Sequence, residues 1–247
     1  MISIDGGYLV FHDRFDAGWQ LAAHPDLRKI KSLPAKEKNS YIVISIPRGG
    51  TVVGDVIAQQ LNLTHDLVFS KKMPLPERPE ITIGAVSEFG DVTWNNNARR
   101  LNVINKPQIL HSKVQQIHES KRRKQKYRGQ RKPLESLSGK TVILVDDGLA
   151  TGATMKSAVM TCQRFSAESI IVAVPCGAAD CIKDIRGIVD KVICLSVPYN
   201  FDTIGQCYIF FPEMIDQEVI AIMAKYQDVK NGKIPNSPYL AIQSSFS

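Results

Sequence analysis

Two adjacent carboxylates, Asp146 and Asp147, follow a short apolar run and precede a loop of small residues with two threonines. The full stretch from Val142 to Thr154 reads VILVDDGLATGAT. The apolar run predicts a buried strand, and the pattern after the loop predicts the start of a helix. Carboxylates accept hydrogen bonds from sugar hydroxyls, whereas N–H groups at a helix N-terminus attract phosphate. This order of residues therefore predicts a site for a ligand with both a sugar and a phosphate.

The loop after the two aspartates has the composition of a phosphate-binding loop. Small residues let the backbone approach a phosphate closely, and Thr151 and Thr154 add hydroxyl donors. A Walker A loop is excluded because it needs a lysine where Ala153 stands. The alternative is an ordinary strand-to-helix turn with solvated aspartates. The expected phosphate-binding residues are Gly148, Leu149, Ala150, Thr151, Gly152, Ala153 and Thr154.

Two further basic loops follow predicted strands. Arg48, Gly49 and Gly50 come after the apolar run 41–46, and the glycines permit a close backbone approach while arginine offers a phosphate-matching fork. Lys71 and Lys72 follow the run 66–70. Either lysine suits an anion across the cleft from Arg48, and the sequence does not choose between them. At both loops the alternative is a turn with solvated side chains.

Apolar runs rich in β-branched residues alternate with amphipathic segments along the chain. This alternation predicts a doubly wound α/β domain, with a mainly parallel sheet flanked by helices. We expect one domain over residues 1–230, a stiff loop at 74–79 because of its prolines, and an irregular tail at 231–247. The expected strands are 41–46, 66–70, 82–87, 141–145, 170–174 and 191–195. The expected helices are 14–29, 51–61, 107–127, 153–165, 178–185 and 216–224.

The net charge of +7 arises from one segment, because residues 112–133 hold nine Lys or Arg and a single acid, Glu119. We expect a solvated or substrate-steering helix within the basic segment 107–132, with an RNA-binding surface as the alternative. One aromatic residue there is a poor platform for stacking bases, so a nucleic acid partner is not the favoured interpretation. No apolar run is long enough to span a bilayer, and the five cysteines form no C-x-x-C pair. A cytoplasmic protein with reduced cysteines is expected.

The stretch 142–154 resembles the signature of the type I phosphoribosyltransferases, which bind 5-phosphoribosyl-1-pyrophosphate (PRPP). With Pro47–Gly50, Pro79–Glu80 and Ile83–Val86, it is similar to a poorly characterised, phosphoribosyltransferase-like branch, over about residues 11–223. The resemblance implies that Asp146 and Asp147 hold the ribose hydroxyls and that residues 148–154 hold the 5-phosphate. It also implies that Arg48, Gly49, Gly50, Lys71 and Lys72 surround the pyrophosphate.

By this resemblance the protein transfers the phosphoribosyl group of PRPP to a nitrogenous base, with Mg²⁺ held mostly by substrate oxygens and water. No catalytic residue or direct metal ligand can be assigned. Ala150 stands where the 6-oxopurine enzymes carry an acid, so the acceptor base stays unknown. A variable hood over the base is expected from residues 1–24 and 197–212. A PRPP- or nucleotide-sensing regulator of the same fold is the alternative. A homodimer is common in the family, but no periodicity here indicates one.

Overall fold

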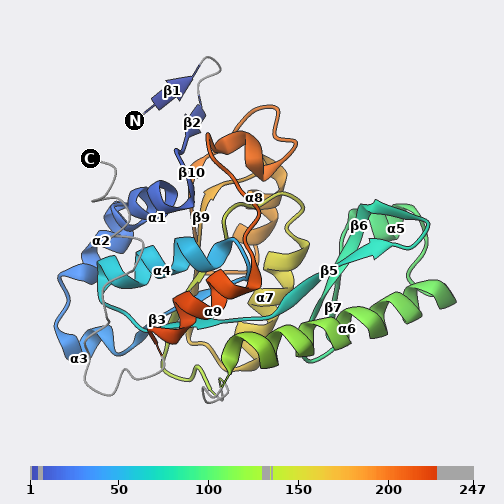
Figure 1. The fold of residues 1–247 in the computed structure, drawn as a ribbon, viewed down its shortest axis with the longest axis horizontal. Coiled ribbons are helices and arrows are strands. Elements are labelled where there is room, and N and C mark those ends of the chain that lie inside the picture. Colours follow the sequence, from blue (N-terminus) through green and yellow to red (C-terminus); the bar gives the residue numbers. More distant parts are fainter. Residues whose placement is uncertain (1, 5–7, 130–133, 135, 227–247) are drawn as a thin grey trace.

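The computed structural model describes residues 2–4, 8–129, 134 and 136–226, and its body is built on one parallel sheet (Figure 1). The strand order β10-β9-β8-β3-β4 places the first strand of the body next to the third, as the doubly wound fold requires. The five strands are β3 (Tyr41–Ser45), β4 (His65–Leu67), β8 (Thr141–Val145), β9 (Ser169–Cys176) and β10 (Lys191–Ser196). This architecture confirms the predicted fold class.

Both faces of the sheet are buried, and alternate residues of each strand enter different cores. In β8, for example, Ile143 and Val145 join the core on one face, whereas Val142 and Leu144 join the core on the other. The first face is covered by α1 (Arg14–Ala22), α2 (Pro25–Lys31), α4 (Gly50–Leu61) and α9 (Asp216–Ala224). The opposite face is covered by α7 (Ala153–Arg164) and α8 (Ala179–Arg186). A short helix, α3 (Ala35–Lys38), has no buried residue.

A lobe that the sequence analysis did not anticipate projects from one side of the body (Figure 1). It begins where β4 ends and contains an antiparallel sheet in the order β5-β6-β7. Its elements are β5 (Ser70–Leu75), β6 (Arg78–Ser87), β7 (Val92–Trp94), α5 (Asn96–Arg100) and α6 (Pro107–Arg128). The long helix α6 leads from the lobe back to the body, where it packs beside α9 (Figure 1).

Two predictions about this region were wrong. Residues 82–87 do form a strand, but it belongs to β6 in the antiparallel sheet of the lobe and not to the parallel sheet. Residues 74–79 are not a stiff loop, because β5 and β6 pair almost to their shared turn at Pro76 and Glu77. The prolines are tolerated because the register shifts on both sides of Pro74, which interrupts the regular hydrogen-bond ladder.

Most predicted helices are confirmed within two residues of their ends, but the segment 14–29 is two helices. Helix α1 ends at Ala22, and a new helix starts at Pro25, whose ring cannot continue a helix but suits its first position. The predicted tail at 231–247 lies outside the described residues. Among the described helices, none is both long and apolar enough to cross a membrane.

The segments proposed to form the hood do lie against each other. Backbone bonds connect Phe11 N to Cys207 O and Ile209 N to Phe11 O over 2.8 and 2.9 Å. The described parts of these segments include α1, the strand β2 (Tyr8–Val10) with its partner β1 (Ile2–Ile4), and a single 3-10 turn, η1 (Ile204–Cys207). Phe11, Cys207 and Tyr208 share a small apolar core.

Candidate functional site

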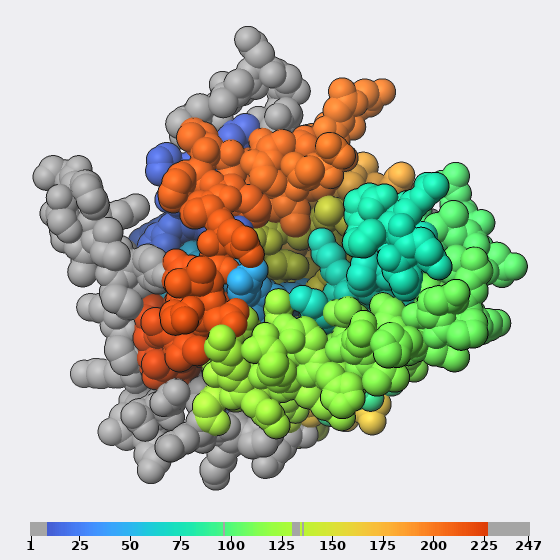
Figure 2. Space-filling view, turned by 45° about the vertical axis from the view of Figure 1, so that its right-hand side comes forward, coloured from blue at the N-terminus to red at the C-terminus, as the bar shows by residue number. Residues whose placement is uncertain are grey.

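The two glycine-containing loops meet in one cleft. Strands β3 and β8 are direct neighbours, so the loops that follow them, 46–50 and 146–154, emerge side by side at the carboxyl edge of the sheet. Both loops line a cleft of about 360 Å³. Figure 2 shows the molecule hollowed on this side, between the orange and red C-terminal segments, the green helix α6 and the teal lobe.

Gly49 and Gly50 are required because the two loops nearly touch. A Cβ atom at Gly49 would lie 1.7 Å from Asp147 Oδ2, and one at Gly50 would lie 2.8 Å from Asp146 Cα. No side chain fits at such separations, since real Cβ atoms do not approach within 3.0 Å of another heavy atom. The loop expected to bind pyrophosphate therefore lies directly against the two carboxylates expected to bind the ribose. The peptide bond between Pro47 and Arg48 is cis.

The two aspartates have different surroundings. Asp147 is buried and forms an ion pair with Arg14, whose Nε donates to Asp147 Oδ2 over 2.8 Å. The Tyr208 hydroxyl donates to the Asp147 backbone carbonyl over 2.6 Å. Asp146 has no cation at its carboxylate, and its Oδ1 accepts only from the backbone N–H of Asp147 among the described residues. Enclosure by protein, and then the neighbouring Asp147 carboxylate, raise the pKa of Asp146.

Arg14 is itself held on several sides. Its Nη1 donates to Pro212 O over 2.7 Å, and its guanidinium lies 3.8 Å from the centroid of the Phe211 ring. Arg14 lies in the first turn of α1. Its ion pair with Asp147 therefore connects this N-terminal helix to the cleft. Sequence reasoning missed Arg14, since nothing in the pattern of residues 14–29 distinguishes it from other polar residues of an amphipathic helix.

The phosphate loop ends at the start of α7. Gly152 has a φ of +69°, which is the left-handed conformation that favours glycine, and α7 begins at the next residue. Thr154 Oγ1 and Ser70 Oγ are both buried and have no hydrogen-bond partner among the described residues. Both residues line the cleft. Buried hydroxyl groups without partners are costly, so these two are suited to donate to an anionic ligand.

Four cationic side chains line the same cleft: Arg48, Lys71, Lys72 and Arg123. Lys71 is half-buried and Lys72 is exposed, and both come from the start of β5. Burial, and then the nearby Arg123 guanidinium, lower the pKa of Lys71. Both lysines border the cleft.

Arg48 is paired with carboxylates from the C-terminal segment. Its Nη2 donates to Glu213 Oε1, and its Nη1 lies 3.9 Å from Asp216 Oδ1. Asp216 also accepts from Lys126 Nζ over 2.6 Å and from the Tyr127 hydroxyl over 2.5 Å. These two hydrogen bonds lower the pKa of Asp216 to about 2, while burial and the bond to Asp216 raise the pKa of Tyr127 to about 12.

Most of the described cations of the basic helix α6 form ion pairs, three with residues elsewhere in the chain and two with Glu119 of the helix itself. These ion pairs are Arg122 and Arg123 with Glu119, Lys124 with Glu88, Lys126 with Asp216, and Arg128 with Asp66. Their charges are therefore partly neutralised within the fold. This favours a solvated or substrate-steering helix over an RNA-binding surface. Arg123 is the exception to a purely solvated face, because it borders the cleft. Arg131 and Lys132 lie outside the described residues.

Comparison with known proteins identifies the family of this chain. The family model for the phosphoribosyl transferase domain matches residues 20–208. Two curated relatives from Mycobacterium tuberculosis, strains CDC 1551 / Oshkosh and H37Rv, are both named "Putative phosphoribosyl transferase". Each is 33% identical over 214 residues, which are 87% of this chain and 46% of the relative. The chain thus spans about half the length of these relatives.

A solved structure supports the same assignment. The crystal structure of TT1426 from Thermus thermophilus is 32% identical, with a TM-score of 0.69, and the match covers 88% of this chain and 99% of that one. The chain is therefore a member of the type I phosphoribosyltransferase family.

Proposed function

We propose that the cleft transfers the phosphoribosyl group of PRPP to a nitrogenous base and releases pyrophosphate. One observation carries this proposal: the Arg48–Gly50 loop and the Asp146–Thr154 loop line the same cleft, at the close separation that Gly49 and Gly50 permit. In the proposed complex Asp146 and Asp147 bind the ribose hydroxyls, and residues 148–154 bind the 5-phosphate. Arg48, Lys71 and Lys72 face the pyrophosphate, and Arg123 joins them.

The proposed chemistry is a displacement at C1 of the ribose. A nitrogen of the base forms the new bond to C1, while the bond from C1 to the pyrophosphate oxygen breaks and its electron pair leaves with pyrophosphate. The four cations lining the cleft stabilise the negative charge that develops on the leaving group. The carboxylates beside the ribose stabilise the positive charge that develops on the sugar ring. Catalysis therefore rests on positioning and electrostatics.

A Mg²⁺ ion suits this cleft. Hard cations prefer carboxylate and phosphate oxygens, and the Asp146 side chain forms no ion pair with a described cation. Among the described residues, no group of three or more His, Cys, Asp or Glu is arranged to hold a metal by itself. Asp146, with Asp147 beside it, would hold the ion together with substrate oxygens and water. When bound, the ion would neutralise pyrophosphate charge.

Calorimetry with PRPP and Mg²⁺, followed by a pyrophosphate-release assay against a panel of purine and pyrimidine bases, tests the proposal. We expect saturable PRPP binding and pyrophosphate release with one class of base. Absence of PRPP binding would refute the assignment of the cleft. Binding without turnover on any base would instead favour the nucleotide-sensing alternative.

A further inference from the structure

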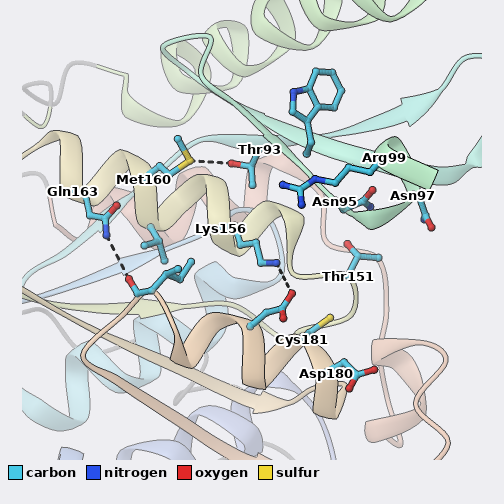
Figure 3. A pocket seen from close by; sticks show the side chains of 14 residues that line it. Thr93, Asn95, Asn97, Arg99, Thr151, Lys156, Met160, Gln163, Asp180 and Cys181 are labelled. Atoms are coloured by element: carbon cyan, nitrogen blue, oxygen red, sulfur yellow. Dashed lines mark hydrogen bonds and ion pairs between the residues drawn. The ribbon is translucent and has the colours of Figure 1, made fainter. Parts of the chain in front are cut away.

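The main chain of the loop after β8 is held from two sides. On one side, Leu149 N donates to Cys176 O at the end of β9 over 2.9 Å. On the same side, Cys181 Sγ donates to Ala150 O over 2.7 Å, and Cys181 also borders a second hollow, of about 830 Å³, between α8 and the lobe (Figure 3). On the other side, the contact comes from Tyr208, which follows η1. The loop therefore has anchors both in the body and in the segment expected to form the hood.

Tyr208 reaches the loop at the carbonyl group of Asp147. Its hydroxyl donates to Asp147 O over 2.6 Å, and no backbone N–H of the described residues donates to the same oxygen. Burial, and then the nearby Asp147 carboxylate, raise the pKa of Tyr208 well above its ordinary value. The hydroxyl therefore stays protonated at neutral pH and remains a donor to this carbonyl.

This hydrogen bond fixes the orientation of one peptide group in the phosphate loop. Asp147 C=O and Gly148 N–H belong to the same peptide, which is trans, since the only cis bond in the described part of the chain joins Pro47 to Arg48. In a planar trans peptide the C=O and N–H bonds point in opposite directions. Gly148 N–H therefore points away from Tyr208, and it has no acceptor among the residues that the structure describes. Because Gly148 lines the cleft, this N–H is available to a ligand.

The side chain of Asp147 is held separately, by Arg14. Arg14 Nε donates to Oδ2, whereas Oδ1 accepts from no described residue and is left for a ribose hydroxyl. The ring of Phe211 connects the two anchors of Asp147. It lies 3.8 Å from the Arg14 guanidinium and stacks on Tyr208, with 4.7 Å between the ring centroids. Asp147 is thus fixed at both its main chain and its side chain by contacts that support each other.

We propose that Tyr208 is a positioning residue for the ribose and the 5-phosphate of PRPP. Through the Asp147 carbonyl, its hydroxyl sets the plane of the 147–148 peptide and so presents the Asp147 carboxylate and the Gly148 N–H to the ligand together. This role rests on the proposed function, since it requires that the cleft bind PRPP. The cations expected to face the pyrophosphate come from the loop after β3, from β5 and from α6, so the hydroxyl should not affect pyrophosphate binding.

Calorimetry with three ligands separates positioning from general support of the fold. Ribose 5-phosphate uses the ribose and phosphate sites, pyrophosphate with Mg²⁺ uses the cations, and PRPP with Mg²⁺ uses both. Tyr208→Phe keeps the ring stack and removes only the hydroxyl. It should weaken ribose 5-phosphate and PRPP binding about fivefold, as expected for one lost hydrogen bond, and change pyrophosphate affinity less than about twofold. Tyr41→Phe, at the start of β3 and thus at the opposite edge of the sheet, is the matched control and should leave all three affinities within about twofold.

Phe211→Leu provides a second variant, because it keeps the Tyr208 hydroxyl but removes the ring between the two anchors. It should also weaken ribose 5-phosphate binding more than pyrophosphate binding. Equal losses for the two ligands in both variants would show that these residues only support the fold, and would overturn the proposal. Unchanged affinities in Tyr208→Phe would overturn it too, while PRPP binding by the wild type would still support the proposed function. A wild-type protein that binds neither PRPP nor ribose 5-phosphate would instead refute the proposed function, and this role with it.

Discussion

Arg14 Nε donates to Asp147 Oδ2 over 2.8 Å, although the two residues are 133 positions apart in the chain. Both side chains are almost fully buried, at 10% and 12% exposure. Removal of one partner of a buried pair leaves an uncompensated charge, which typically costs about 3 kcal/mol or more. The pair therefore joins the N-terminal helix to the expected ribose site and gives Asp147 a structural role besides ligand binding.

Asp147→Asn is expected to lower the free energy of unfolding by about 3 kcal/mol at neutral pH, as measured by urea denaturation. Arg14→Gln should cost a similar amount. In a double-mutant cycle the two losses should add to more than the loss in the double variant, because the pair is broken by either change. Strictly additive losses would show that the contact contributes little to stability.

Asp146→Asn is expected to have the opposite effect on stability. Its raised pKa means that the folded protein binds a proton more tightly than the unfolded chain, so this group destabilises the fold increasingly as pH rises from the ordinary pKa of 3.8 to the raised value. The isosteric amide removes that cost and can still accept from Asp147 N. The melting temperature at pH 7.5 should therefore rise, by more than it does at pH 4.

The same variant should lose PRPP affinity, since an amide is a weaker acceptor than a carboxylate for ribose hydroxyls. Calorimetry at pH 7.5 with saturating Mg²⁺ measures this loss. In the wild type, affinity should increase with pH as Asp146 deprotonates. A variant that is less stable but binds PRPP normally would contradict both expectations.

Gly49→Ala is expected to abolish PRPP binding and to destabilise the protein by about 1–3 kcal/mol. The added methyl would lie 1.7 Å from Asp147 Oδ2 and 2.8 Å from Arg14 Nε, so the ion pair and the loop must move apart. Gly187→Ala is the matched control, because the nearest contact of its Cβ would be Asp184 O at 3.4 Å, and its φ is −75°. Equal melting temperatures for the two variants would show that the loop tolerates a side chain.

The part of the site that could be predicted from the sequence is local in the chain. Strand β8, the loop 146–154 and helix α7 follow one another without interruption, so composition and order alone identify them. The loop after β3 could be found in the same way, because parallel strands bring their carboxyl ends to one edge. The two loops line one cleft with all of their residues except Gly50 and Ala153.

The contacts that the sequence did not indicate are distant in the chain or depend on the face of a helix. In the sequence, Arg14 is only one of several polar residues of an amphipathic helix. Its contact with Asp147 depends on the fold. Helix α6 has only a weak apolar stripe in the sequence, so no periodicity assigned Arg123 to the cleft. The lobe was missed because Pro74 and Pro79 indicated a loop, whereas an irregular register accommodates them in a hairpin.

Adjacent arginines of α6 provide a test of the charge that this helix supplies to the cleft. Arg122 and Arg123 both pair with Glu119, but the Arg122 side chain is 56% exposed, and only Arg123, at 19%, lines the cleft. Arg123→Gln should weaken PRPP and pyrophosphate binding about tenfold, because a charge-assisted contact with the leaving group is lost. Arg122→Gln should change both affinities less than about twofold at roughly 0.15 M salt, where exposed charges are screened. Calorimetry with pyrophosphate and Mg²⁺ measures both variants, and similar losses in the two would mean that α6 acts on the cleft only through its general positive potential.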